Sequence, residues 1–106
     1  MTNNYFKNLK QGGIPFMEGR DKGDIRDLLN AKVHIEDYGF INGDNGQYAV
    51  FIVKENDKEF YCGGQAVTEI LKQIKADGHK DELPEQECVL EEMTSKNKRK
   101  YITITF

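Results

Sequence analysis

The 106-residue sequence contains no tryptophan and only two cysteines and two prolines. No apolar run approaches the ~20 residues that a membrane-spanning helix needs, so we expect no contact with a membrane. The first residues lack the basic start and the apolar core of a secretion signal, which indicates a cytoplasmic protein. Cys62 and Cys88 form no Cys-x-x-Cys motif and are expected to be free thiols in that reducing compartment.

Signatures of catalysis and of metal binding are also missing. No serine, cysteine or lysine stands in a recognisable nucleophile arrangement, and no glycine run matches a phosphate-binding loop. His34 and His79 have no carboxylate or thiol at metal-ligand spacing, and the turn at Asn42–Gly46 lacks the glycine and the closing glutamate of a calcium loop. The sequence predicts neither an enzyme nor a metal or cofactor site, although a small enzyme with an unrecognised site stays a weaker alternative.

The charged residues are segregated along the chain. Fifteen Lys and Arg residues stand against 18 Asp and Glu residues, which gives a net charge of −3. That balance argues against a protein that coats polyanions through bulk charge. The one dense cationic run consists of Lys96, Lys98, Arg99 and Lys100. A local basic surface is therefore the charge pattern that carries information about a ligand.

Hydrophobic periodicity predicts five strands and one helix. The strands are expected at residues 32–41, 47–55, 59–62, 88–93 and 101–106. Apolar residues at i, i+3, i+4 and i+7 predict a helix over 64–78, which ends at Gly78. Gly39 indicates a bulge in the first strand, and Asn42–Gly46 predicts a tight hairpin turn. Residues 1–23 are expected to form an irregular N-terminal arm, and residues 24–106 the domain.

This order of elements favours a mainly β fold. Five strands with one α-helix between the third and the fourth are typical of the OB-fold, so we expect a five-stranded OB-like barrel. That fold binds single-stranded nucleic acid more often than any other ligand. The predicted function depends on this topology, because the sequence contains no catalytic signature that would indicate another function.

The candidate binding residues come from the basic loop and from the tyrosines of the strands. The loop supplies four cations for phosphates and one amide for a phosphate or a base, namely Lys96, Asn97, Lys98, Arg99 and Lys100. Tyr48, Tyr61 and Tyr101 are the candidates for stacking on bases. The alternatives are a solvated hairpin tip for the loop and ordinary sheet packing for the tyrosines. Phe40 and Phe51 are expected in the core.

The strands at Tyr48–Val53 and Phe60–Cys62, the helix at Val67–Ile74 and the ending Ser95–Tyr101 resemble one family over roughly residues 24–106. This family is the small OB-fold single-stranded DNA-binding proteins that phages and prophages of Gram-positive bacteria encode. The resemblance implies an accessory protein of DNA replication or recombination, which protects transient single strands as a homo-oligomer.

Two functions therefore stay open. The first is non-specific binding of single-stranded DNA, with RNA as an alternative ligand. The second is a protein-interaction module of a phage or mobile element, which binds a host factor and no nucleic acid. They differ in one structural feature, since only the first function needs the basic loop and the exposed tyrosines on one face.

Overall fold

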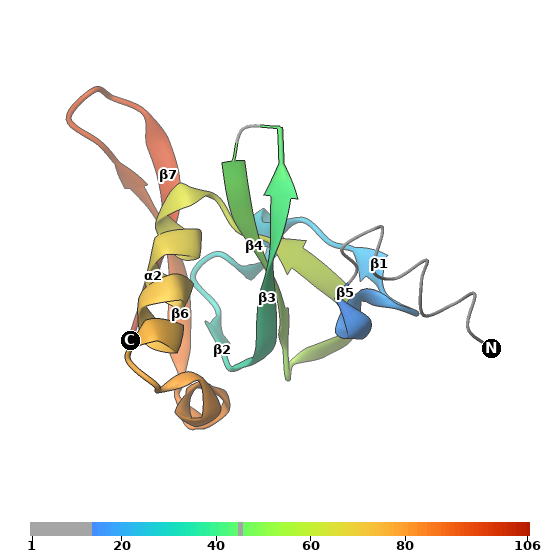
Figure 1. The fold of residues 1–106 in the computed structure, drawn as a ribbon. Helices are drawn as coiled ribbons and strands as arrows, with labels where there is room; N and C mark the ends of the chain where they lie inside the picture. The colour runs from blue at the N-terminus through green and yellow to red at the C-terminus, as the bar shows by residue number, and fades with distance from the viewer. Residues whose placement is uncertain (1–13, 45) are drawn as a thin grey trace.

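The computed structural model describes residues 14–44 and 46–106, and it is mainly β (Figure 1). Four strands form one sheet in the order β1 (Asp21–Lys22), β5 (Asn56–Cys62), β4 (Gly46–Val53) and β3 (Ile35–Gly43). Three strands form a second sheet in the order β2 (Lys32–Val33), β6 (Cys88–Thr94) and β7 (Lys100–Thr105). Residues 1–13, which make up most of the expected N-terminal arm, lie outside the described residues.

Helix α2 (Gln65–Ala76) follows β5, between the third and the fourth of the expected strands. Three short 3₁₀ turns accompany it: η1 (Pro15–Met17), η2 (Ile25–Leu28) and η3 (Lys80–Glu85). Asp24 caps η2, because its carboxylate accepts a hydrogen bond from the Arg26 backbone N–H at 3.0 Å. In the part of the chain that the structure describes, no helix is long and apolar enough to cross a membrane.

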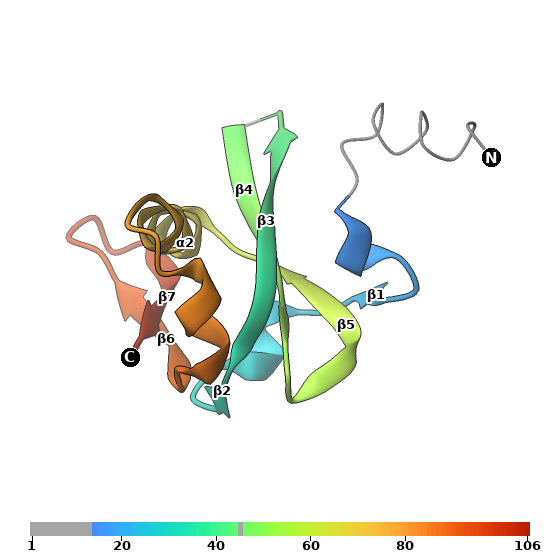
Figure 2. The ribbon, with the colours of Figure 1, turned by 60° about the horizontal axis from the view of Figure 1, so that its bottom comes forward.

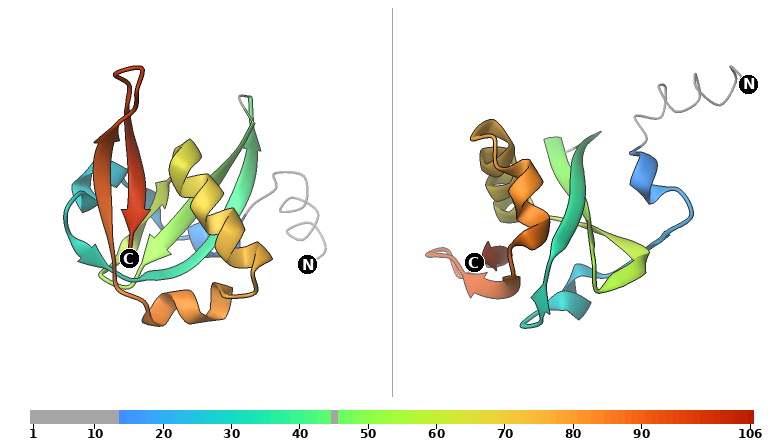
Figure 3. Two further views of the ribbon diagram at one scale, coloured as in Figure 1. Left: turned by 90° about the vertical axis from the view of Figure 1, so that its left-hand side faces the viewer. Right: turned by 90° about the horizontal axis from the view of Figure 1, so that it is seen from below.

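The first expected strand is divided between the two sheets. β2 pairs with β6 and β3 pairs with β4, and only His34 separates β2 from β3. The chain therefore crosses from one sheet to the other at His34. β2 belongs to the sheet of β6 and β7, and β3 belongs to the sheet of β4 and β5. The strands do not close into a barrel: in residues 14–44 and 46–106, no backbone pairing joins β5 to β7. Helix α2 packs instead against β4 and β7, between the β3–β4 and β6–β7 hairpins (Figure 3, left).

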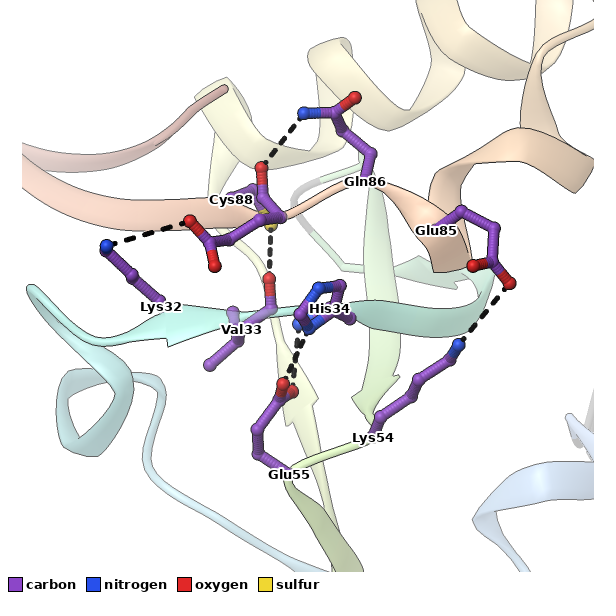
Figure 4. A network of polar contacts seen from close by, with 9 residues as sticks. Lys32, Val33, His34, Lys54, Glu55, Glu85, Gln86 and Cys88 are labelled. Atoms are coloured by element: carbon purple, nitrogen blue, oxygen red, sulfur yellow. Dashed lines mark hydrogen bonds and ion pairs between the residues drawn. The ribbon is translucent and has the colours of Figure 1, made fainter.

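The junction between the sheets is held by polar contacts around His34 (Figure 4). Glu55 accepts hydrogen bonds from the His34 backbone N–H at 2.8 Å and from the His34 ring at 2.7 Å. On the other side of the junction, Cys88 Sγ donates to the Val33 carbonyl at 3.4 Å. Burial raises the pKa of the Cys88 thiol to about 11. Cys88 and Cys62 are both free thiols, as expected.

The second of the expected strands, β4, is the most deeply buried. β4 lies between β3 and β5, and its residues 49–53 are buried. The apolar stripe of α2 faces this core, with Val67 and Leu71 fully buried and Ile70 and Ile74 packed at its edge. A continuous apolar run is thus the sign of a strand that is covered on both faces.

Gly39 does not form the expected bulge. It pairs regularly with Val50, and the irregularity lies between Ile35 and Asp37. The reason for a glycine here is close packing, because a Cβ at residue 39 would lie 2.8 Å from Ile14 Cδ1. Ile14 belongs to the segment at η1, which stands on the side of the sheet away from α2 (Figure 2). β1 follows η1 and pairs in parallel with β5.

Candidate nucleic-acid interface

The basic loop forms the tip of the β6–β7 hairpin. The Ser95 N–H donates to the Arg99 carbonyl at 2.8 Å, and the Lys98 N–H donates to the Ser95 carbonyl at 2.9 Å. Lys98 completes this tight turn in the left-handed region, at φ 63°. These bonds use the backbone and the Ser95 hydroxyl, so the side chains of Lys96, Asn97, Lys98 and Arg99 all extend into solvent.

The cations of the loop are largely unpaired. In residues 14–44 and 46–106, no carboxylate lies within 4.0 Å of Lys96, Lys98 or Arg99. Lys100 Nζ lies 3.9 Å from Glu92 Oε1 at the base of the hairpin. The loop therefore presents three charges that are available to an anion, as electrostatic binding of phosphates requires.

Next to the loop lies a pocket of about 610 Å³. Arg99, Lys100 and Tyr101 of the hairpin line one side of it, together with Arg26 and Glu92. The N-terminal part of α2 and its N-cap residue line the other side through Gly64, Gln65, Ala66 and Glu69. Gly64 is the N-cap residue of α2 and has no side chain, so the first N–H groups of the helix have no capping side chain at this pocket.

A second pocket of about 650 Å³ lies between α2 and the β3–β4 hairpin. Tyr48 is half-buried in its wall, and Lys72 lines it from the helix. Gly64, Gln65 and Glu69 line both pockets, so the two hollows adjoin at the start of α2. Both hairpin tips extend beyond this end of the helix (Figure 3, left). Tyr48 and the basic hairpin are thereby brought to one continuous surface.

Tyr101 lies at the rim of this surface. Its side chain is 41% exposed, and its partner across the hairpin is Met93, which is 42% exposed. Because side chains alternate along a strand, Tyr101 points away from the core face that carries Ile102 and Ile104. Phe106, expected to end the last strand, lies beyond the end of β7 and is 57% exposed.

The expectation that Tyr61 is exposed is wrong. Its side chain is only 2% exposed, its ring lies 5.7 Å from that of Phe51, and its hydroxyl accepts a hydrogen bond from Asn56 Nδ2 at 2.8 Å. The physical reason is cover from the N-terminal segment, since a Cβ at Gly23 would lie 2.7 Å from Tyr61 Cε1. Tyr61 therefore does not belong to the candidate interface.

Sequence reasoning missed three residues beside the Tyr48 pocket. Phe40, expected in the core, packs against the edge of the core and is partly exposed, with Lys72 Nζ at 5.9 Å and Lys75 Nζ at 5.8 Å from the centre of its ring. The signal that could have found this cluster is the i, i+3 spacing of the two lysines on the polar face of the helix. No local pattern places Arg26 beside the basic hairpin, because its contact with Glu92 spans 66 positions of sequence.

No known family, characterised protein or solved structure matches the chain. Within residues 14–44 and 46–106, no group of three or more His, Cys, Asp or Glu side chains is arranged to hold a metal ion. The functional argument therefore depends on the geometry of the surface itself.

Proposed function

We propose that the protein binds single-stranded DNA without strong sequence preference, as an accessory protein of DNA replication or recombination. The binding surface consists of the loop residues Lys96, Asn97, Lys98 and Arg99, with Lys100, Tyr101 and Tyr48 along the two adjoining pockets. The observation that carries the proposal is the junction of these pockets at Gly64, Gln65 and Glu69, which places unpaired cations and an accessible tyrosine along one hollow.

The chemistry of this surface suits an unpaired strand. Phosphates pair with the loop cations, and each such contact releases counterions. Tyrosine rings offer flat faces on which any base can stack, which explains binding that tolerates many sequences. The uncapped N-terminus of α2 adds a partial positive charge between the two pockets. A net charge of −3 on the whole chain is compatible with this function, because binding depends on the local field.

The proposed architecture is an opened relative of the five-stranded OB barrel. Support comes from the first expected strand, which is shared between the two sheets, and from the helix between the third and fourth strands. In that fold the loops between strands 1 and 2 and between strands 4 and 5 frame the binding groove. Here these loops correspond to the β3–β4 and β6–β7 hairpin tips, on either side of the pockets.

The alternative, a protein-interaction module, is favoured by one observation. Met93 and Tyr101 form an exposed pair across the β6–β7 hairpin. Exposed apolar patches often mark contacts with other proteins. Absence of binding to any nucleic acid would favour this function over the first.

The proposal is tested by the salt dependence of binding to labelled oligo-dT. Replacing Lys98 and Arg99 by alanine should flatten the slope of log K against log salt by about 1.4 units, at about 0.7 per phosphate contact. The matched control replaces Lys22 and Lys58, which have the same total charge and lie on β1 and β5, away from the hairpin tips. A slope that stays unchanged in the folded loop variant would contradict the proposal.

A further inference from the structure

Two lysines of α2 lie over the ring of Phe40 and are not among the residues of the proposed binding surface. Phe40 lies on β3, where the alternation of side chains turns Gly39 toward Ile14 and Phe40 toward α2. Its ring packs edge-on against Tyr38 at 5.8 Å. Lys72 and Lys75 are three residues apart on α2, and their ammonium groups lie 5.9 and 5.8 Å from the ring centre. An aromatic face and two cations therefore meet at the surface.

These two lysines differ from Lys80, which also lies over a ring of this cluster. Lys80 Nζ is 4.9 Å from the Tyr38 ring, 3.3 Å from Asp37 Oδ1 and 3.2 Å from the Tyr38 carbonyl, so its charge is committed to the fold. Within residues 14–44 and 46–106, neither Lys72 nor Lys75 has a carboxylate within 4.0 Å. Both side chains are exposed and retain a charge that an external anion can use.

The cluster adjoins the Tyr48 pocket. Lys72 lines that pocket and also covers Phe40, so one side chain belongs to both features. On the paired strands, Phe40 and Ala49 share the face toward α2, whereas the next pair, Ile41 and Tyr48, alternates to the other face, so the link between the two features is Lys72. A strand that occupied the pocket would therefore reach Phe40 by continuing along the exposed face of α2.

We infer that the single strand continues from the Tyr48 pocket onto this cluster. There a base stacks on Phe40, while Lys72 and Lys75 move from the ring to the flanking phosphates. The exchange is favourable, because a stacked base binds a ring more strongly than an exposed ammonium group does. The flexible lysine side chains need only a change of rotamer. This inference rests on the proposed function and extends the path of the ligand beyond the two pockets.

Oligonucleotides of two lengths test the extension. Binding of oligo-dT of about 4 and about 16 nucleotides, which bracket the usual site sizes of such domains, is compared for two variants. Lys72→Ala/Lys75→Ala should flatten the salt slope of the long oligonucleotide by about 1.4 units. Phe40→Leu keeps an apolar side chain but no stacking face, and it should weaken binding of the long oligonucleotide about tenfold. The short oligonucleotide should bind Phe40→Leu as it binds the unchanged protein. Because Lys72 also lines the pocket, Lys72→Ala/Lys75→Ala should flatten the slope of the short oligonucleotide by only about 0.7 units, half of the change for the long one.

Lys22→Ala/Lys58→Ala is the matched control, with the same loss of charge on other strands. An unchanged slope for the long oligonucleotide in Lys72→Ala/Lys75→Ala would overturn the extension and leave the proposed function intact. Equal losses for both lengths would also overturn it, since the cluster would then belong to the primary site. If neither oligonucleotide binds the unchanged protein, the extension and the proposed function both fail. The double lysine variant keeps the test decisive even if Phe40→Leu unfolds.

Discussion

Glu92 accepts a hydrogen bond from the Arg26 guanidinium at 3.0 Å, and its second carboxylate oxygen lies 3.9 Å from Lys100 Nζ. Both cations line the pocket beside the basic hairpin. The carboxylate therefore holds two cations in place and also neutralises them. A phosphate that enters this pocket must compete with Glu92 for the same two partners.

Glu92→Gln should strengthen the binding of single-stranded DNA and make it steeper in salt. The neutral amide frees Arg26 and Lys100, and each new phosphate contact adds about 0.7 to the slope. The control is Glu87→Gln, which removes the same charge from a carboxylate 3.9 Å from Lys32. Anisotropy titrations at several salt concentrations measure both variants. Equal gains in the two would mean that net charge alone is responsible.

Gly64→Asp should stabilise the fold and weaken binding. Gly64 has the extended backbone of an N-cap residue, at φ −78° and ψ −167°, and a Cβ there would meet no atom within 4 Å. An aspartate at this position caps α2 and should raise the free energy of unfolding by about a few tenths of a kcal/mol, because glycine is itself a fair N-cap residue. It also places a negative charge where the two pockets join. Gly64→Asn is the neutral control and should weaken binding less. Unchanged affinity in the stabilised aspartate variant would exclude this junction from the ligand path.

Tyr61 and Tyr101 should respond in opposite ways to replacement by alanine. Tyr61→Ala removes a fully buried ring, and the free energy of unfolding should fall by about 3–5 kcal/mol. Tyr101→Ala should leave stability nearly unchanged and weaken binding by about 1–3 kcal/mol through the loss of stacking. Chemical denaturation and oligo-dT titration provide the two measurements. A Tyr101→Ala variant that is folded and binds normally would remove Tyr101 from the interface.

The contact between Glu55 and His34 predicts a dependence of stability on pH. Partial burial alone would raise the pKa of Glu55, but the hydrogen bonds from His34 outweigh it and hold this pKa below its ordinary value of 4.5. The ionised carboxylate is thus favoured in the folded state. Its contribution is present above the ordinary value and is lost as pH falls through the lower folded-state value.

Glu55→Gln should therefore reduce the free energy of unfolding at about pH 7, and the difference should shrink toward about pH 3. Denaturant titrations across this range measure the effect. Glu85→Gln is the control, because its carboxylate is 86% exposed and lies 3.7 Å from Lys54, where solvent screens the pair. A difference that does not vary with pH would show that the His34 contact does not stabilise the ionised carboxylate.

Several features of the fold follow from local patterns in the sequence. The apolar run of β4, the stripe of α2 and the turn residues before Gly46 are each sufficient to place an element. The division of residues 32–41 at His34 could not be predicted, because the alternation of side chains continues through it. It depends on pairing with β6, which is more than 50 positions away in the sequence.

The residues of the candidate site were likewise predicted where they form a local pattern and not where they depend on contacts between distant segments. The basic loop is a local feature, so its residues were found together. The burial of Tyr61 depends on Gly23, which lies in a segment without hydrophobic periodicity. The surroundings of Phe40 depend on Lys72 and Lys75 of α2, which lie more than 30 positions away in the sequence. Such contacts between distant segments have no sign in a single sequence.

The most direct test of single-strand binding compares fluorescence anisotropy of labelled oligo-dT with competition by a duplex of equal length, at two salt concentrations. Stacking on Tyr48 and Tyr101 requires unpaired base faces, which a duplex hides. We predict tight binding to the single strand that weakens steeply with salt, and weak competition by the duplex. Equal affinity for the two forms, or no binding to either, would contradict the account.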